Sequence, residues 1–143
     1  MKKLFVDTNI AIDLFEKREP FYPHAANLFS MADKGKVKLF VSSLTFEIAN
    51  YLISKANSSS RTREILLKFK ILVTVLSLSD KVVDLALNDR SFPDFEDGLQ
   101  YHTAIVNESE MIITRNLKDY KNSRIPVMTA QQYMARIDTI SNE

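Results

Sequence analysis

Short, continuous apolar runs alternate with stretches of helical periodicity along the whole chain. The apolar runs cover residues 4–6, 38–42, 71–76, 111–114 and 125–128. Between runs, apolar residues recur at helical spacing, as Ile10, Ala11, Leu14 and Phe15 do after the first one. Strands without polar alternation are buried on both faces, which is typical of parallel sheets covered by helices. The pattern therefore predicts an α/β protein with three layers (α/β/α) and a central parallel sheet of four to five strands.

The chain length and the punctuation of the sequence fit one domain. With 143 residues and no repeat or low-complexity segment, residues 1–143 are predicted to form a single domain. Side chains that accept hydrogen bonds from free helix N–H groups stand at the expected helix starts. These residues are Asp7, Ser43, Ser79, Asp94 and Thr129.

The composition excludes several kinds of catalytic chemistry. The chain has no cysteine, so disulfides, thiolate metal sites and thiol catalysis are excluded. Its two histidines leave little room for histidine-based zinc sites or relays. Its two glycines, Gly35 and Gly98, can form neither a dinucleotide-binding glycine loop nor a P-loop.

Acidic side chains recur at the predicted carboxyl edge of the sheet, beyond which ligands bind in open α/β folds. Asp7 follows the first strand, Glu47 the second, and Asp119 the fourth, while Asp97 begins the helix before that strand. Converging carboxylates repel one another unless they are protonated or share a cation. Because Mg²⁺ and Mn²⁺ prefer oxygen ligands, the pattern predicts a divalent metal site able to support phosphodiester cleavage.

Four segments together resemble the PIN domain family, and within it the VapC-type toxins of bacterial toxin–antitoxin pairs. They are residues 5–9 (FVDTN), 44–47 (LTFE), 97–99 (DGL) and 114–120 (TRNLKDY). The resemblance runs from about residue 4 to about residue 127. It implies a PIN-like fold and a metal-dependent ribonuclease that leaves 5′-phosphate and 3′-hydroxyl ends.

The resemblance also implies the residues of the site. Asp7, Glu47, Asp97 and Asp119 are predicted as catalytic residues and as ligands of Mg²⁺ or Mn²⁺. A second set is predicted to support these residues or to contact substrate: Asp94, Asn116, Thr8, Asn9, Thr114 and Arg115. Asn116 stands where the family often has an aspartate, which leaves open whether Asn116 or Asp119 completes the site.

Most of these residues also have a purely structural interpretation. Asp7 and Asp94 can act as helix caps, and Glu47 and Asp97 can complement helix dipoles. Asp119 can end a surface turn. His102 lies five residues after Asp97, on a different helical face, so it is expected to be a structural histidine.

Charge is segregated along the chain although the formal net charge is only +1. Residues 55–70 carry five basic side chains and one acid, and residues 89–110 carry six acids and one arginine. Basic segments beside a metal site would hold an RNA backbone, but they can equally be solvated helix faces. Both interpretations stay open for residues 55–70, whereas Arg115, within the motif, is predicted to contact substrate.

The leading hypothesis is a Mg²⁺- or Mn²⁺-dependent endoribonuclease, the toxin of a type II toxin–antitoxin pair. By resemblance it would bind RNA and an antitoxin protein and form a homodimer, with no sequence-specific DNA binding of its own. It is expected to be cytoplasmic, because the chain has neither a signal peptide nor a membrane-length apolar run.

Three alternatives compete with this hypothesis. An inactive PIN-like binding partner is supported by Asn116, and a housekeeping RNA-processing nuclease would share the same site. A phospho-acceptor receiver domain is disfavoured, because the predicted third strand ends Val75-Leu76-Ser77 without a phosphorylatable aspartate. The fifth strand likewise leads into Met128 and Thr129 rather than a lysine.

Overall fold

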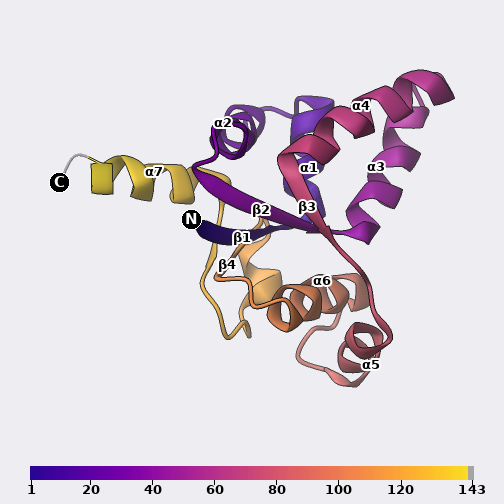
Figure 1. The fold of residues 1–143 in the computed structure, drawn as a ribbon. Helices are drawn as coiled ribbons and strands as arrows, with labels where there is room; N and C mark the ends of the chain where they lie inside the picture. The colour runs from indigo at the N-terminus through magenta and orange to yellow at the C-terminus, as the bar shows by residue number, and fades with distance from the viewer. Residues whose placement is uncertain (142–143) are drawn as a thin grey trace.

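The computed structural model describes residues 1–141 and contains a five-stranded sheet in the order β3-β2-β1-β4-β5 (Figure 1). Every neighbouring pair of strands is parallel. The strands are β1 (Lys2–Val6), β2 (Val37–Ser42), β3 (Val73–Leu76), β4 (Met111–Ile113) and β5 (Val127–Met128). The predicted α/β fold with a parallel central sheet is therefore confirmed.

Helices cover both faces of this sheet (Figure 1). One layer contains α1 (Thr8–Glu16), α2 (Tyr22–Asp33), α3 (Ser43–Ser54) and α4 (Ser59–Leu72). The C-terminal helix α7 (Ala130–Ser141) packs beside α2 through Ala130 and Tyr133. The other layer contains α5 (Asp80–Asn88) and α6 (Phe95–Val106), and a 3₁₀ helix, η1 (Leu117–Tyr120), follows β4. No described helix is long and apolar enough to cross a membrane.

Successive strand residues divide between two apolar clusters. Leu4 and Val6 of β1 belong to the cluster beneath α1, α2 and α4, whereas Phe5 belongs to the cluster beneath α6. In β2, Val41 and Phe40 divide between the same two clusters. Side chains alternate between the faces of a strand, and both faces are covered here, so the strands read as unbroken apolar runs.

The central strand β1 lies where the direction of strand addition reverses. The chain moves from β1 to β2 and β3 on one side, and later returns to place β4 and β5 on the other. The carboxyl edge at such a reversal is the usual ligand site of open α/β sheets. Asp7 follows β1 directly and therefore stands at this point.

Two local predictions were wrong. The third strand begins at Val73 rather than residue 71, because α4 continues through Leu72 and places Phe69 and Leu72 on the core. The β-branched, apolar side chain of Ile71 favoured a strand in the sequence analysis. In the structure Ile71 lies on the solvent side of α4 and is 81% exposed. The cap of α3 is Ser42 rather than Ser43, and its side chain does not cap the helix.

Candidate active site

Asp7 is a buried carboxylate held by uncharged donors. It caps α1, accepting a hydrogen bond from the Thr8 backbone N–H at 2.8 Å. The Thr114 hydroxyl donates to it at 2.8 Å, and the Asn9 side-chain amide lies at 3.4 Å. Burial raises the pKa of Asp7, although the hydrogen bonds from Thr114 and from the Thr8 backbone oppose the shift. The site therefore contains a desolvated carboxylate with no cationic partner among these donors.

Helix α6 brings a second carboxylate, Asp97, close to Asp7. Asp94 caps this helix by accepting a hydrogen bond from the Asp97 N–H at 3.2 Å, so its predicted capping alternative is confirmed. Partial burial is the main cause that raises the pKa of Asp97 to about 7, followed by the charges of Asp94 and Asp7. Asp119 and Glu96 add to the same repulsion. Four neighbouring acids thus act on Asp97, and a cation would relieve their repulsion.

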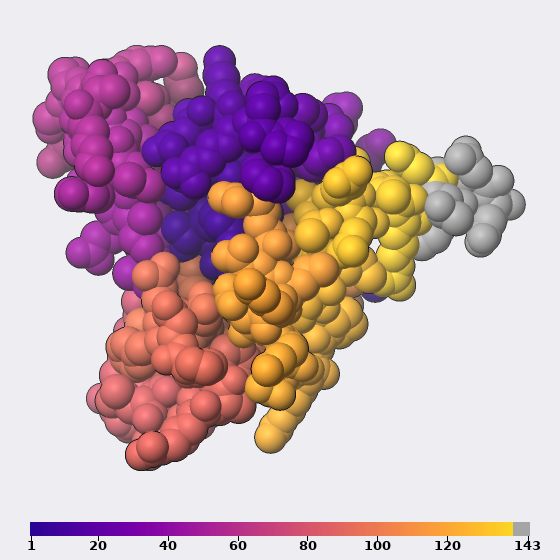
Figure 2. Space-filling model, turned by 180° about the vertical axis from the view of Figure 1, so that it is seen from behind, coloured from indigo at the N-terminus to yellow at the C-terminus, as the bar shows by residue number. Residues whose placement is uncertain are grey.

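A cavity of about 240 Å³ opens at this edge of the sheet. Most of its lining is polar or charged and comes from separate parts of the chain: Asp7, Thr8, Asn9, Ile12, Arg18, Leu52, Glu96, Asp97 and Asn116. Figure 2 shows the corresponding recess, where the indigo start of α1 lies between the magenta, salmon and orange parts of the surface. Arg18 is the cationic side chain of this lining, and it was not predicted as a site residue from the sequence.

Hydrogen bonds join the segment after β4 to the start of α1. The Asn9 side chain donates to the Thr114 hydroxyl at 3.3 Å and accepts from the Arg115 N–H at 3.3 Å. The Thr114 hydroxyl also accepts from the Asn116 N–H at 3.1 Å. On the other side, the Thr8 and Thr45 hydroxyls are 2.8 Å apart, which joins α1 to α3. The predicted supporting residues Thr8, Asn9 and Thr114 therefore lie around Asp7.

Two further polar side chains near Asp7 were not predicted as site residues from the sequence. Gln100 is fully buried on α6 and contacts Asp7, Thr8 and Ser42. Tyr120 is buried close to Asp7, but its hydroxyl has no hydrogen bond of normal geometry among the described residues. Burial raises the pKa of Tyr120, and the charges of Asp7 and Asp97 raise it further. A polar residue three positions after Asp97 was the available signal for Gln100.

The structure treats the two candidates for the fourth position differently. Asn116 is exposed and lines the cavity. Asp119 is half-buried in η1 and does not line the cavity, but its charge contributes to the raised pKa of Asp97. Which of the two completes the site stays a prediction.

Glu47 is not among the residues around this cavity. It is exposed on α3. Its role as a ligand therefore stays a prediction. Within residues 1–141, no group of three or more Asp, Glu or His side chains is arranged to hold a metal ion by itself. A Mg²⁺ ion nevertheless fits such a site, because it commonly binds one or two carboxylates and keeps several waters.

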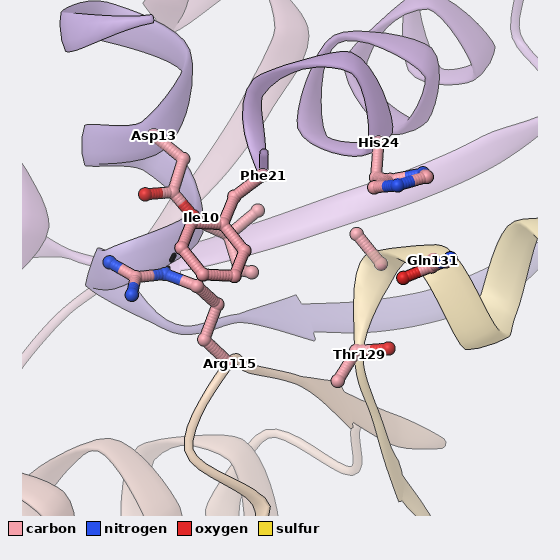
Figure 3. A pocket seen from close by; sticks show the side chains of 8 residues that line it. Ile10, Asp13, Phe21, His24, Arg115, Thr129 and Gln131 are labelled. Carbon is pink, nitrogen blue, oxygen red and sulfur yellow. Dashed lines mark ion pairs between the residues drawn. The ribbon is translucent and has the colours of Figure 1, made fainter. Parts of the chain in front are cut away.

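Arg115 points to a different acid, as Figure 3 shows. Its Nε lies 2.8 Å from Oδ2 of Asp13, which is completely buried, and its guanidinium stacks on Phe21 with Cζ 4.3 Å from the ring centre. The pair borders a separate cavity of about 90 Å³, lined also by His24 and Thr129. Arg115 does not line the carboxylate cavity, so its contact with substrate stays a prediction.

His102 has the structural partner that the sequence led us to expect. Its Nε2 lies 2.8 Å from Oδ2 of Asp89, and the Ser91 hydroxyl donates to the other oxygen of the same carboxylate. The hydrogen bonds of Asp89, led by the one from Ser91, lower its pKa despite partial desolvation. This group lies apart from the lining of the carboxylate cavity.

Comparison with known proteins supports the same family. Ribonuclease VapC1 from Aquifex aeolicus (strain VF5) is 26% identical over 146 residues, covering 97% of this chain and 98% of the relative. Among solved structures, VapBC2 from Rickettsia felis bound to a promoter DNA fragment has a TM-score of 0.66 at 20% identity, covering 88% of this chain and 96% of that chain. A toxin–antitoxin complex from Klebsiella pneumoniae has a TM-score of 0.67 at 25% identity, covering 89% and 97%.

The family model for the PIN domain matches residues 3–118, which include most of β1, Asp7, the start of α6 with Asp97 and β4. The matched segment is most of the chain and contains Asp7, Glu96 and Asp97, the three acids that line the cavity. The chain belongs to the PIN domain family.

Proposed function

We propose that this protein is a divalent-metal-dependent endoribonuclease, the VapC-type toxin of a type II toxin–antitoxin system. The observation that carries the proposal is that Asp7 and Asp97 line one cavity together with Glu96, and that neither of the two aspartates forms an ion pair among the described residues. The likeness to a ribonuclease over nearly the full length of both chains supports it.

Asp7 and Asp97 are the residues that would hold a Mg²⁺ or Mn²⁺ ion, with Asp119 or Asn116 beside them. Glu47 on α3 is predicted as a further ligand from the family resemblance, although it does not line the cavity. When bound, the ion supplies polarisation of an attacking water and compensation for charge on the phosphate. The donor set fits a hard cation, because it consists of carboxylate, amide and hydroxyl oxygens.

The other residues of the cavity would position the carboxylates and the RNA. Thr114 and Asn9 fix the orientation of Asp7, and the Thr8–Thr45 contact fixes α3 beside it. Arg18 would contact an RNA phosphate at the cavity edge, since a guanidinium can bind two phosphate oxygens at once. Without a cation, Asp97 would hold a proton near neutral pH.

The partners that we propose are RNA, a cognate antitoxin and a second copy of the chain, in the cytoplasm. The Rickettsia felis and Klebsiella pneumoniae structures are toxin–antitoxin complexes, and their likeness to this chain supports an antitoxin partner. The homodimer rests on the family resemblance alone, and the location repeats the expectation drawn from the sequence. We expect this chain to make no sequence-specific contact with DNA.

Two observations keep a second candidate, a weakly active or inactive binding partner. Asn116 supplies no charge where the family often has an aspartate, and Glu47 does not line the cavity with Asp7 and Asp97. A housekeeping RNA-processing nuclease would share the proposed chemistry and differ only in its targets.

The test is cleavage of total RNA with Mg²⁺, Mn²⁺ or EDTA by the wild type, Asp97→Asn and Asp33→Asn. We expect cleavage only with metal and about a 100-fold loss in Asp97→Asn, since charge compensation of the phosphate is lost. Asp33 is an exposed acid at the end of α2, so Asp33→Asn is the control and should leave the rate of cleavage unchanged. Cleavage that persists in EDTA contradicts the mechanism, and no cleavage by any variant favours the binding partner.

A further inference from the structure

We propose that Gln100 is a positioning residue: its side-chain amide fixes helix α6 against the end of β1 and so sets how Asp97 stands relative to Asp7. This inference rests on the proposed function, because its consequence is the affinity of the carboxylate site for a divalent ion. Gln100 does not itself line the cavity and acts through Asp7 and Thr8.

The contacts of Gln100 satisfy a completely buried amide. Its Oε1 accepts a hydrogen bond from the Ser42 hydroxyl at 2.6 Å. Its Nε2 donates to the Thr8 hydroxyl at 2.7 Å and lies 3.4 Å from Oδ1 of Asp7. Gln100 is 0% exposed, so each of these contacts replaces a bond to water. The amide is therefore fixed in place by partners from two strand ends.

The carboxylate of Asp7 decides which way the amide points. A carboxylate only accepts hydrogen bonds, so Nε2 must face Asp7 and Oε1 must face Ser42. Thr8 then accepts from Gln100 and is free to donate its own proton to Thr45 on α3. The orientation of a single amide thus links β2, α6, α1 and α3 around Asp7.

The position of Gln100 on α6 connects this network to Asp97. The two residues are three positions apart, so they share one side of the helix. Ser42 ends β2 and precedes α3, where its hydroxyl would normally cap the helix but instead donates to Gln100. Ser42 thus contacts Gln100 on α6 instead of capping α3, which indicates that the contact with α6 has a role of its own.

The test compares Gln100→Met with Thr103→Val in metal-free protein. Methionine has nearly the length of glutamine but cannot hold Asp7 or Ser42. Thr103 is the matched control, because it is buried on the same helix and its hydroxyl donates only to the Leu99 carbonyl at 2.7 Å. The measurements are the Kd for Mn²⁺ by calorimetry, the thermal midpoint without metal, and RNA cleavage against Mn²⁺ concentration.

We expect Gln100→Met to weaken Mn²⁺ binding by about 10-fold or more, as is usual when a group that orients a ligand is removed. Saturating Mn²⁺ should restore cleavage to within about threefold of the wild type, because the acids themselves are intact. Thr103→Val should bind Mn²⁺ within about twofold of the wild type. Ser42→Ala, which removes only the anchor of Oε1, should weaken Mn²⁺ binding by a smaller factor and serves if Gln100→Met does not fold.

Two results would overturn the inference while leaving the proposed function intact. One is that Gln100→Met binds Mn²⁺ as tightly as the wild type does. If Gln100→Met does not fold, the same result for Ser42→Ala counts. The other is an equal loss of Mn²⁺ binding in Thr103→Val, which would make any disturbance of α6 responsible. Failure of the wild type itself to bind Mn²⁺ would overturn both the inference and the proposed function.

Discussion

Two buried aspartates at the start of the chain have opposite surroundings. Asp7, the N-cap of α1, is contacted by neutral donors such as Thr114 and lies near the carboxylate of Asp97. Asp13, within the same helix, forms an ion pair with Arg115. Burial raises the pKa of both carboxylates, but the opposing effect comes from hydrogen bonds at Asp7 and mainly from Arg115 at Asp13.

The comparison separates a carboxylate that is paired within the protein from one that is available to a ligand. Asp13 has its own cation, and the pair attaches the segment after β4 to α1. Asp7 has hydrogen bonds that orient it but forms no ion pair within the described part of the chain, and another acid stands close by. A buried acid of this second kind requires a proton or a cation from outside the chain.

The largest expected effect is the loss of activity in Asp7→Asn. We expect RNA cleavage to fall by about 100-fold or more, because an amide cannot supply the charge that binds a divalent ion. The thermal midpoint without metal should not fall, since asparagine caps helices as well as aspartate and carries no buried charge. Cleavage assays and thermal unfolding check both parts, and a strongly lowered midpoint would show that Asp7 is structural like Asp13.

Asp13→Asn should show the reverse pattern. It leaves Arg115 without its counter-charge and should lower the free energy of unfolding by about 3 kcal/mol, the low end for buried pairs. The low end applies because about a quarter (24%) of the Arg115 side chain is exposed. Urea unfolding measures the loss. Cleavage per folded molecule and Mn²⁺ affinity should change little, and a selective loss of Mn²⁺ binding would place Asp13 in the site.

The pH dependence of stability should report the uncompensated acids. The pKa of Asp97 is raised from 3.8 to about 7, so the folded state holds the proton more tightly than the unfolded state. Metal-free protein should therefore lose stability as the pH rises from 3.8 to about 7. Thermal unfolding across this range should show a smaller decline in Asp97→Asn and with Mn²⁺ present. Superimposable curves for all three would contradict the repulsion around Asp97.

The smallest effect is expected from substitution of Arg18, which lies near both Asp7 and Asp13. It lines the cavity with Asp7, and its charge also lowers the pKa of Asp13. Arg18→Ala should raise KM for RNA by about fivefold and reduce the salt slope of binding by about 0.7, the value for one phosphate on a single strand. Arg61, which pairs with Glu64 on α4, is the matched control. An equal effect in Arg61→Ala would assign RNA binding to the basic face of α4.

The fold and the edge that carries the site were predictable from local patterns. Apolar runs flanked by helical periodicity predict the parallel sheet, and an acid after a strand end predicts its position at the edge. The third strand was misplaced because residues 71 and 72 suit a strand and a helix equally, and only the packing of Leu72 on the core decides between them.

The pairings within the site were not predictable, because their partners are distant in the sequence. Arg115 meets Asp13, and Gln100 meets Ser42 and Thr8, across intervals that no local pattern covers. The motif around Arg115 suggested a substrate contact, and no sequence signal indicated that a buried acid on α1 lies beside it. Arg18 lies just after α1 and belongs to no recognisable motif. It lines the cavity because the fold of the chain places it there.

Composition and spacing limit the chemistry that is available to this chain, which has no thiol, two histidines, two glycines, and acids after successive strands. Tertiary structure alone decided which acid is balanced within the chain and which is left without a cation. The reason is physical, since desolvation and charge repulsion depend on distance in space and on exclusion of water. Asp7 and Asp13 are the same residue type in one short segment, and they differ because Arg115 reaches only Asp13.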